Sequence, residues 1–316
     1  MIKEGEMYSI TVPASTANLG PGFDSIGLAL GLYLNLQVQL AKEWEIIPLS
    51  KELAVFPSNE DNYIISIANK VAAYYGKALQ PCRVYISSDI PLTRGLGSSA
   101  SAIVAGIELA DAAGGLKLSK EEKNRHASSL EGHPDNAGAS VYGGLVVGRH
   151  FADKTDVLSF PLDEVKVVAV IPDYELPTEG SRNVLPDHLS FSRAVQAGAV
   201  GNVMVAALLS KQWQLAGEMM KNDEFHQPYR SHLVPHSAKV EEVALKAGAF
   251  GTALSGAGPT VVSFVLRDKA DRVKNSLAEA FPEFLVKELE IDNQGSRVEL
   301  LEESNRKSKE ISMGHE

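Results

Sequence analysis

The stretch Pro91-Leu92-Thr93-Arg94-Gly95-Leu96-Gly97-Ser98-Ser99-Ala100 separates a strand-like run, residues 83–90, from a helix-like run, residues 101–113. Gly95 and Gly97 allow backbone angles that are closed to other residues, and their missing side chains leave main-chain N–H groups open to a ligand. The two serines that follow begin a helix, whose free N–H groups and positive dipole end suit an anion. This stretch therefore predicts the phosphate loop of a nucleotide site.

Three other interpretations of the same stretch have to be weighed. A Walker loop ends in Gly-Lys-Ser/Thr, whereas Gly97 is followed by Ser98, so that pattern is not met. Residues 95–100 do fit the G-x-G-x-x-A dinucleotide pattern, but such a site needs a following strand with an acid about 20 residues on. Residues 114–119 instead close one helix and open another. A helix start with small residues for close packing stays open as a structural alternative.

Length and composition are those of a folded protein with room for two domains. The chain has 316 residues, of which 44% are hydrophobic and 22% charged. Its formal net charge of −10, with Lys and Arg dispersed, argues against a nucleic-acid surface or a patch for anionic membranes. The first residues carry charges and no apolar signal core, and no run approaches the ~18 apolar residues of a membrane span. We therefore expect a cytoplasmic protein with a small-molecule ligand, and the single cysteine, Cys82, excludes an internal disulfide and a Cys-rich zinc site.

Residues 13–24 form a second notable stretch, because they combine mostly small side chains with two glycines and two prolines. This composition predicts a constrained loop that lets a ligand approach its backbone, between strands over residues 8–12 and 31–40. Asn18 and Asp24 are its polar side chains with reach. They are explained equally well as turn formers or a cap and as ligand-binding groups.

Asn62 ends a polar run, residues 58–62, ahead of an apolar helix that is predicted over residues 63–75. Helix capping accounts for most of this polar cluster. Asn62 can also face a ligand, so both alternatives stay open.

A capping box, Ser119 to Glu122, begins another helix near residue 120, which ends at Glu131. There the chain turns polar as Gly132-His133-Pro134-Asp135-Asn136. A glutamate at a helix C-terminus faces the negative end of the dipole, which is unfavourable unless a cation lies nearby. A solvated Glu131 is the common explanation. With a phosphate loop upstream, Mg²⁺ is a credible cation, since one or two protein oxygens and nucleotide phosphates usually hold it.

The composition shifts over residues 153–163, where we place the domain boundary. In the second half, polar loops carry Arg182 and Arg230. Another glycine-rich turn, residues 251–260 with Gly256 in it, precedes a strand. A tight helix-to-strand connection explains this turn as well as a ligand cradle does. Two separate cradles in one chain nevertheless favour a ligand cleft.

Residues 12–24, 91–101 and 131–136, in this order, resemble the GHMP small-molecule kinases, which phosphorylate galactose, homoserine, mevalonate and similar alcohols. The resemblance covers nearly the whole chain. Pro91-x-x-x-Gly95-Leu96-Gly97-Ser98-Ser99-Ala100 is similar to the family's ATP loop, and it is followed by Ser101, where many members have alanine. The first and third stretches are similar to the homoserine-phosphorylating branch and not to the sugar or isoprenoid branches.

The resemblance implies a two-domain α+β fold. Its N-terminal ATP-binding domain, residues 1–160, would contain a left-handed βαβ unit, an exception to the usual crossover rule. A ferredoxin-like C-terminal domain, residues 161–303, and a charged tail, residues 304–316, would follow. The resemblance also implies ATP, Mg²⁺, a homodimer and a place in threonine biosynthesis, with L-homoserine phosphorylated on its side-chain hydroxyl.

The resemblance further places the family's site residues on matching positions of this chain. The nucleotide would contact Asn62, Pro91, Leu92, Thr93, Arg94, Gly95, Leu96, Gly97, Ser98, Ser99, Ala100 and Ser101. The acceptor alcohol would contact Asn18, Asp24, His133, Arg182, Arg230 and Gly256. Ser99 and Glu131 would hold Mg²⁺, and the expected catalytic residues are Glu131, Asp135 and Asn136.

The charges at these positions suit an amino-acid alcohol. Homoserine carries an ammonium, a carboxylate and a hydroxyl, so a selective site needs an anion, a cationic clamp and a group near the hydroxyl. Arg182 and Arg230 would bind the carboxylate through their guanidinium forks, and Asp24 with Asn18 would hold the amine. Two other functions stay open: another alcohol kinase of the family, and a non-catalytic nucleotide or amino-acid sensor on the same fold.

Overall fold

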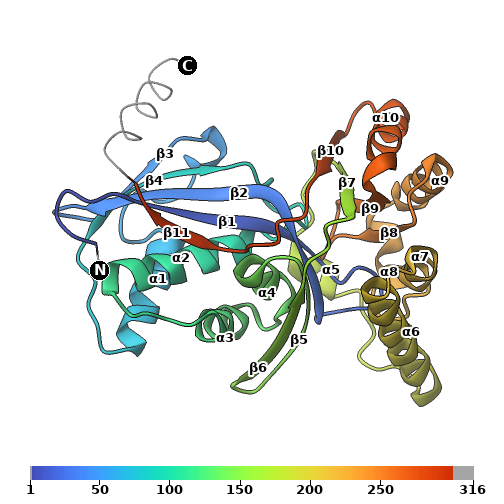
Figure 1. Ribbon diagram of the computed structural model, residues 1–316, viewed down its shortest axis with the longest axis horizontal. Helices are drawn as coiled ribbons and strands as arrows, with labels where there is room; N and C mark the ends of the chain where they lie inside the picture. Colours follow the sequence, from blue (N-terminus) through green and yellow to red (C-terminus); the bar gives the residue numbers. More distant parts are fainter. Residues whose placement is uncertain (1, 302–316) are drawn as a thin grey trace.

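Two β-sheets, each with helices packed on it, make up the chain (Figure 1). The structure is a computed structural model that describes residues 2–301. The first sheet has seven strands, with β11-β1-β2-β4-β3 as its main order, and β5 and β6 extend it beside β2. The second sheet has four strands in the order β10-β7-β9-β8. This arrangement confirms the predicted α+β fold, while the predicted tail, residues 304–316, lies outside the described residues.

The central strands of the first sheet are β1 (Tyr8–Ala17) and β2 (Ile26–Leu40), which pair antiparallel. The prediction of a loop from residue 13 onward was wrong, because β1 continues to Ala17. Residues 13–17 stay extended since all of them are buried, between β2 and the helices beneath the sheet (Figure 1). The connecting loop is short and spans residues 18–25.

A parallel pair, β3 (Glu45–Pro48) and β4 (Cys82–Ser88), flanks helix α1 (Tyr63–Tyr74) in sequence. Strand, helix and parallel strand form the expected βαβ unit, and its handedness remains what the resemblance implies. α1 begins as predicted because the Asn62 side chain accepts a hydrogen bond from Ile64 N.

Below the first sheet in Figure 1, α1 is joined by α2 (Ser98–Gly114), α3 (Lys120–Glu131) and α4 (Asp135–Tyr142). α3 begins with the predicted capping box at Ser119. α4 was not predicted, since its small residues show no apolar period, yet most of them are buried. Asp135 and Asn136 therefore open a helix, and the polar turn before them ends at Pro134.

A hairpin of β5 (Leu145–Phe151) and β6 (Lys154–Phe160) follows. β6 was missed, because its polar residues were interpreted as a composition shift between domains. The last strand, β11 (Arg297–Leu300), returns to pair with β1, although it lies within the range predicted for the second domain. The division at residue 160 stays a prediction.

The second sheet consists of β7 (Val165–Ile171), β8 (Gly251–Leu254), β9 (Val261–Leu266) and β10 (Leu285–Leu289). Its strands pair antiparallel, and their order, with the first strand between the fourth and the third, is that of a ferredoxin-like sheet. The predicted turn from residue 251 begins later, because the first four of its residues form β8.

The remaining helices lie mostly in the second half. They are α5 (Thr178–Arg182), α6 (Phe191–Leu209), α7 (Trp213–Lys221), α8 (Gln227–Arg230), α9 (Ser237–Ala247) and α10 (Ala270–Ala280), with short 3₁₀ turns at Lys51–Leu53, Ser231–Leu233 and Arg267–Lys269. Arg182 and Arg230 were expected in loops, but each is the last residue of a short helix. A cation is favourable at that end of a helix.

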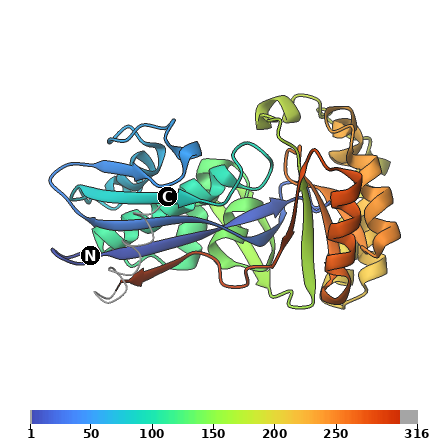
Figure 2. The same cartoon turned by 90° about the horizontal axis from the view of Figure 1, so that it is seen from above.

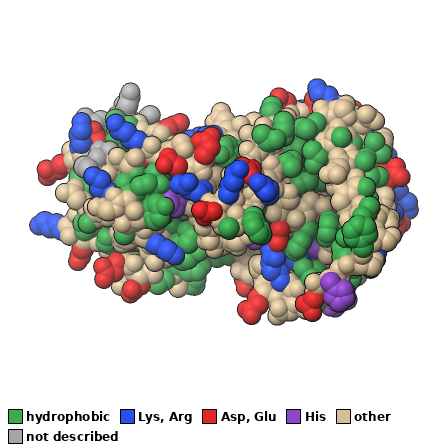
Figure 3. Space-filling view, turned by 90° about the horizontal axis from the view of Figure 1, so that it is seen from below, with side chains coloured by type: hydrophobic (Ala, Val, Ile, Leu, Met, Phe, Trp, Pro, Cys, Tyr) green, Lys and Arg blue, Asp and Glu red, His purple; other side chains and the backbone are tan. Residues whose placement is uncertain are grey.

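α6 is the one described helix that is long and apolar enough to cross a membrane by length and composition, with a mean hydropathy of 1.2. Its apolar length differs from the expectation that no run approaches that of a membrane span. Ala197, Met204, Ala207 and Leu208 pack into the domain, and the rest of the helix is largely exposed. Figure 3 shows hydrophobic side chains gathered over the C-terminal half, on the side where α6 lies.

Both halves are held together by direct contacts beyond the connecting chain (Figure 2). Gly31 N donates to Glu290 O at 2.8 Å, and Leu30 forms a β-bridge with Ile291. One hydrophobic core cluster includes residues of both sheets, such as Leu30 and Phe264. The loops between the two sheets are therefore held in fixed relation to each other.

Candidate active site

The predicted phosphate loop has a left-handed backbone that favours glycine at two positions. Gly95 has φ +77° and Gly97, the residue before α2, has φ +71°. A Cβ at Gly97 would overlap Ser15 Oγ, and one at Gly95 would overlap the Ser255 carbonyl oxygen. Both the angles and the close neighbours exclude side chains here, so the loop backbone faces its surroundings directly.

The loop is held in place from both halves of the molecule. Leu96 is buried in the core, and its carbonyl accepts from Ser15 N at 3.2 Å. From the second half, Ser255 Oγ donates to Gly95 O at 2.6 Å. Leu176 N donates to Thr93 O at 3.3 Å.

The Arg94 side chain points into the second half and not toward the helix N-terminus where phosphates would bind. Its Nε donates to Pro172 O at 2.9 Å and its Nη1 to Leu92 O at 2.7 Å. Nη2 donates to Asp173 O. Arg94 therefore belongs to the predicted loop by its backbone, while its side chain anchors that loop.

A cavity of about 190 Å³ lies in front of the loop and brings most of the predicted residues together. Every residue predicted for the acceptor and for catalysis lines it, together with six residues of the loop: Asn18, Asp24, Glu131, His133, Asp135, Asn136, Arg182, Arg230 and Gly256, with Thr93, Gly95, Gly97, Ser98, Ser99 and Ala100. We call it the acceptor pocket. Leu96 and Ser101 are buried beneath the loop and do not line it.

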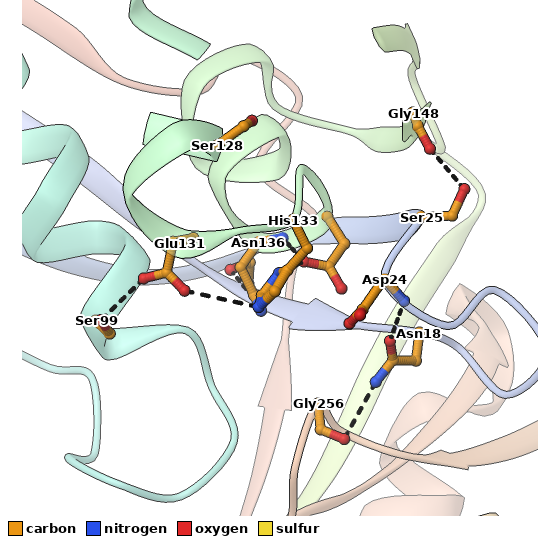
Figure 4. Close-up of polar contacts among 12 residues, drawn as sticks. Asn18, Asp24, Ser25, Ser99, Ser128, Glu131, His133, Asn136, Gly148 and Gly256 are labelled. Atoms are coloured by element: carbon orange, nitrogen blue, oxygen red, sulfur yellow. Dashed lines mark hydrogen bonds and ion pairs between the residues drawn. The ribbon is translucent and has the colours of Figure 1, made fainter. Parts of the chain in front are cut away.

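A chain of polar side chains runs along one wall of the acceptor pocket (Figure 4). Ser99 Oγ donates to Glu131 Oε1 at 2.8 Å, and Glu131 Oε2 lies 3.9 Å from His133 Nε2. His133 Nδ1 lies 2.5 Å from Asp135 Oδ1. Burial lowers the pKa of His133, but the hydrogen bond and charge of Asp135, with the charges of Asp24 and Glu131, outweigh this and raise it to about 9. His133 is therefore a cation at neutral pH, and its Nδ1–H donates to Asp135.

Asn136 completes this wall at the N-terminus of α4. Its backbone N–H donates to Asp135 Oδ1 at 2.7 Å, and its Oδ1 accepts from Ser15 Oγ at 2.9 Å. These bonds fix the side chain, and they leave its amide nitrogen without a partner among the described residues. Asn136 can therefore donate into the pocket.

A second wall, which meets the first near Asp24, carries side chains of both charges. Arg182 Nη1 and Nη2 donate to the two carboxylate oxygens of Asp24 at 3.0 and 2.6 Å. Asp24 N in turn donates to Asn18 Oδ1 at 3.0 Å, and Asn18 Nδ2 donates to Gly256 O at 3.2 Å. Figure 4 shows Asn18 between Asp24 and Gly256. This wall is thus continuous between the two predicted glycine-rich stretches.

Arg230 is buried, with 2% exposure, at the base of the acceptor pocket. Burial and the charge of Arg182 lower its pKa to about 10, so it still carries its charge at neutral pH. The Phe23 ring lies beside both guanidinium groups, with 5.4 Å from its centroid to Arg182 Cζ and the same to Arg230 Cζ. A buried cation at this position is suited to an anion that enters the pocket.

A second, more apolar cavity of about 540 Å³ adjoins the other side of the loop. It is lined by apolar side chains that include Phe56, Tyr63 and Ile90, and by Ser98 and Ser99, which it shares with the acceptor pocket. Asn62 lines it too, but its side chain already caps α1 and donates to Pro57 O at 2.7 Å. The structure thus favours the capping interpretation of Asn62, which also lines this cavity.

Two groups of donors were tested for a metal ion. Ser99 and Glu131 offer hydroxyl and carboxylate oxygens at the N-terminus of α2, and such hard donors suit Mg²⁺. The side chains of Asp24, His133 and Asp135 also lie within 4.8 Å of one another. In that group one donor is a histidine nitrogen, whereas Mg²⁺ takes oxygen ligands, and Asp24 is paired with Arg182. Only the first group fits a magnesium nucleotide.

Sequence reasoning missed several residues that shape the site. Ser15 and Phe23 lie in the small-residue stretch, and the one signal for Phe23 is that it is the only aromatic residue there. His226 contacts Arg230 across one helical turn, 3.1 Å from Nδ1 to Nη1. Its sequence neighbourhood carried no signal for that role.

Comparison with known proteins identifies relatives over the whole chain. The GHMP kinases N terminal domain matches residues 62–144, and the GHMP kinases C terminal domain matches residues 204–283. A homoserine kinase of Bacillus licheniformis is 51% identical over 299 residues, covering 95% of this chain and 98% of that protein. One of Halalkalibacterium halodurans is 47% identical over 292 residues, with coverages of 92% and 94%. A solved homoserine kinase from Cytophaga hutchinsonii superposes with a TM-score of 0.84 at 26% identity, covering 95% of this chain and 99% of that one.

Proposed function

This chain belongs to the GHMP kinase family, and from that premise we propose that it transfers the γ-phosphoryl group of ATP to the side-chain hydroxyl of L-homoserine. The product is O-phospho-L-homoserine. Relatives named homoserine kinase match almost the full length at about half identity. The observation that carries the proposal is the acceptor pocket, where Asp24 and two arginines line the same cavity as the phosphate loop.

ATP is the expected phosphoryl donor, and the two cavities match its two ends. The apolar cavity has the size and lining that suit a nucleoside base. Its border with the acceptor pocket is formed by Ser98 and Ser99, where the free N–H groups of α2 begin. A triphosphate that follows the loop would therefore present its last phosphoryl group to the acceptor.

We propose that Ser99 and Glu131 hold Mg²⁺ on the nucleotide. Bound there, the ion would neutralise phosphate charge during transfer. The Ser99 hydroxyl already lies within hydrogen-bond distance of the Glu131 carboxylate, 2.8 Å from Oγ to Oε1, so the two oxygens are close enough to share an ion.

The acceptor's charged groups have matching partners on the second wall. We propose that the carboxylate binds Arg230 and Arg182 and that the ammonium binds Asp24, with Asn18 fixing the Asp24 loop. Arg182 and Asp24 form an ion pair with each other. When homoserine enters between them, its carboxylate would take the place of Asp24 beside Arg182, and its ammonium would take the place of Arg182 beside Asp24. Each buried charge would therefore keep a counter-charge.

Asp135, Asn136 and His133 are proposed to orient the hydroxyl and to balance charge around it. Phosphoryl transfer proceeds through a loose transition state, so positioning and charge stabilisation carry most of the acceleration. Asn136 and protonated His133 offer hydrogen-bond donors toward the pocket, while Asp135 fixes both of them. None of these residues needs to act as a strong base.

A substrate panel tests this function. ADP release with L-homoserine, mevalonate, galactose and shikimate should show turnover of L-homoserine far above the others. The other alcohols lack an ammonium and a carboxylate on one carbon, so they cannot satisfy both sides of the second wall. No turnover of homoserine would contradict the proposal, and preference for another alcohol would favour the first alternative function. Phosphotransfer of any kind would exclude a non-catalytic sensor.

We further propose a homodimer formed through α6, acting in the cytoplasm in threonine biosynthesis. Supporting the dimer, α6 exposes Val195 and Val203 along one helix, and its last sixteen residues, 194–209, carry no charge. Light scattering after gel filtration should give twice the chain mass. Val203→Glu should give a monomer, whereas Leu245→Glu, an equally exposed change on α9, should not. A monomeric wild type would contradict this part.

A further inference from the structure

The guanidinium of Arg230 is held by three acceptors that leave one of its nitrogens available. Its Nε donates to Ser181 O at 3.0 Å. Its Nη1 donates to Gly256 O at 3.0 Å and to His226 Nδ1 at 3.1 Å. Nη2 has no hydrogen-bond partner among residues 2–301, although Arg230 is 2% exposed and lines the acceptor pocket. The two N–H groups of Nη2 therefore remain for an anion in that pocket.

His226 can accept from Arg230 in only one tautomer. Its Nε2 lies 3.0 Å from Gly20 O, and a carbonyl can only accept, so Nε2 carries the hydrogen and Nδ1 keeps its lone pair. Burial and the charge of Arg230 lower the pKa of His226 to about 3, so the ring is neutral. In a protonated ring Nδ1 would also carry a hydrogen, which would point at the guanidinium. Both groups would then be donors, and the hydrogen bond between them would be lost.

The ring is also fixed on its other sides. The Phe23 ring stacks on it, with centroids 5.4 Å apart and an interplanar angle of 27°. Asp223 accepts from the backbone N–H groups of Phe225 and Gln227 at 2.7 and 2.8 Å, which holds the turn that begins α8. His226 is completely buried. It therefore has no freedom to choose another orientation.

Gly20 gives this contact its functional meaning, because it belongs to the same short loop as Asn18 and Asp24. That loop packs directly on the second half, where a Cβ on Gly20 would overlap the Met220 carbonyl. His226 thus joins the loop that carries Asp24 to the side chain of Arg230. Its two ring nitrogens fix the position of the proposed ammonium partner relative to the proposed carboxylate partner.

We propose that His226 is a positioning residue that sets the preference of this enzyme for a free α-carboxylate, by holding Arg230 at a fixed place relative to the Asp24 loop. This rests on the proposed function. His226 does not line the acceptor pocket and touches no substrate. The alternative is a core histidine that serves stability alone. The two roles predict different results when the ring nitrogens are removed. Only a positioning role weakens binding of the substrate carboxylate specifically.

The experiment compares the wild type with His226→Phe, which keeps a ring against Phe23, and with His226→Gln, which keeps a donor for Gly20 O. The control is His236→Phe, which removes a histidine that also contacts a backbone carbonyl, Pro259 O, and packs on an aromatic ring. L-homoserine and L-homoserine amide, which lacks the carboxylate charge, are the two substrates. KM and kcat are measured for both, and KM for ATP with saturating homoserine.

For His226→Phe we expect the homoserine KM to rise about 10- to 100-fold, as for loss of one hydrogen bond to a charged group, with little change in kcat or in the KM for ATP. The ratio of kcat/KM for homoserine over its amide should fall by a similar factor. His226→Gln should restore part of it, and His236→Phe should leave it unchanged.

Equal loss on both substrates, or an unchanged ratio in an active His226→Phe, would overturn the inference. If that variant is insoluble, the ratio in His226→Gln decides, since it must fall below that of the wild type. A wild type that does not phosphorylate homoserine would refute the proposed function instead, which keeps the two failures distinct.

Discussion

At Gly95 the absence of a side chain allows the phosphate loop to pack directly against the second half of the molecule. Its φ of +77° is unfavourable for any residue with a Cβ, and a Cβ there would also lie 2.9 Å from Gly258 O and closer still to Ser255 O. Gly76 has a similar φ of +67° but no neighbour within 4 Å of an added Cβ. The two glycines separate the cost of the backbone angle from the cost of lost space.

We predict that Gly76→Ala lowers the free energy of unfolding by about 1 to 2 kcal/mol and leaves the kinetics unchanged, since only the backbone angle is strained. Gly95→Ala must also push the loop away from Ser255, and a misplacement of about 1 Å can cost about 100-fold in rate. Urea unfolding and ATP-dependent kinetics on both variants check this. Similar kinetics for the two would mean that the close approach at Gly95 is not required.

His226 gives a pH-dependent prediction for stability. Burial and the charge of Arg230 lower its pKa from 6.5 to about 3, so between these values the unfolded chain binds a proton that the folded protein does not. Stability therefore falls as the pH is lowered from 6.5 toward about 3, with a slope that approaches ~1.4 kcal/mol per pH unit.

Urea unfolding at several pH values in that window, on the wild type and on His226→Phe, measures this contribution. Of the charged groups that face the ring, Arg230 keeps its charge throughout. Burial raises the pKa of Asp223, which acts in the opposite direction but is present in both proteins. The variant should lose less stability on acidification, and parallel losses would count against a buried neutral ring.

At the scale of elements, the site depends on an irregularity in β1. The register of β1 with β2 shifts between Pro13 and Ala14. The Pro13 carbonyl there accepts from Ser101 Oγ of α2 and from Ser140 Oγ of α4, both at 3.0 Å. The Pro13 carbonyl thus connects α2, which begins at the end of the phosphate loop, with α4, which begins at Asp135.

We predict that Ser101→Ala and Ser140→Ala each cost about 1 kcal/mol or less, because the other serine still satisfies the Pro13 carbonyl. The double variant leaves a buried acceptor unsatisfied and should cost about 1 to 3 kcal/mol beyond the sum. A double-mutant cycle by chemical denaturation measures the excess. Strict additivity would show that the two hydroxyls do not share this role.

For the whole molecule, the phosphate loop acts as a joint between the two halves. It belongs to the first half by sequence, yet Arg94 fastens it to the carbonyls of Pro172 and Asp173. The segment that follows these residues leads to Arg182 in α5. The Arg94 side chain and the backbone N–H of Leu176 therefore connect the phosphate loop to the segment that leads to Arg182.

Arg94→Ala should raise the KM for ATP by about tenfold or more, since the loss of charged hydrogen bonds frees the loop, and it should weaken the dependence of ATP binding on homoserine. The control is Arg149→Ala, which removes an exposed arginine paired with Asp156 and should stay within about 0.5 kcal/mol of wild-type stability. Initial rates over a grid of both substrates give the coupling. If ATP binding in Arg94→Ala depends on homoserine as strongly as in the wild type, the phosphate loop does not connect the two halves in this way.

The sequence by itself determined the glycine-rich turn before α2, the starts of α1 and α3, and the family-matched residues that line the acceptor pocket. These depend on local chemistry: glycine angles, capping side chains and motif spacing act within a few residues. Only the tertiary structure decided that β1 continues to Ala17, that α4 is a helix, and that Arg94 points away from the nucleotide. It alone brought Phe23 and His226 to Arg230. These features depend on burial and on contacts between residues some 200 positions apart in the sequence. A local pattern of side chains therefore cannot predict them.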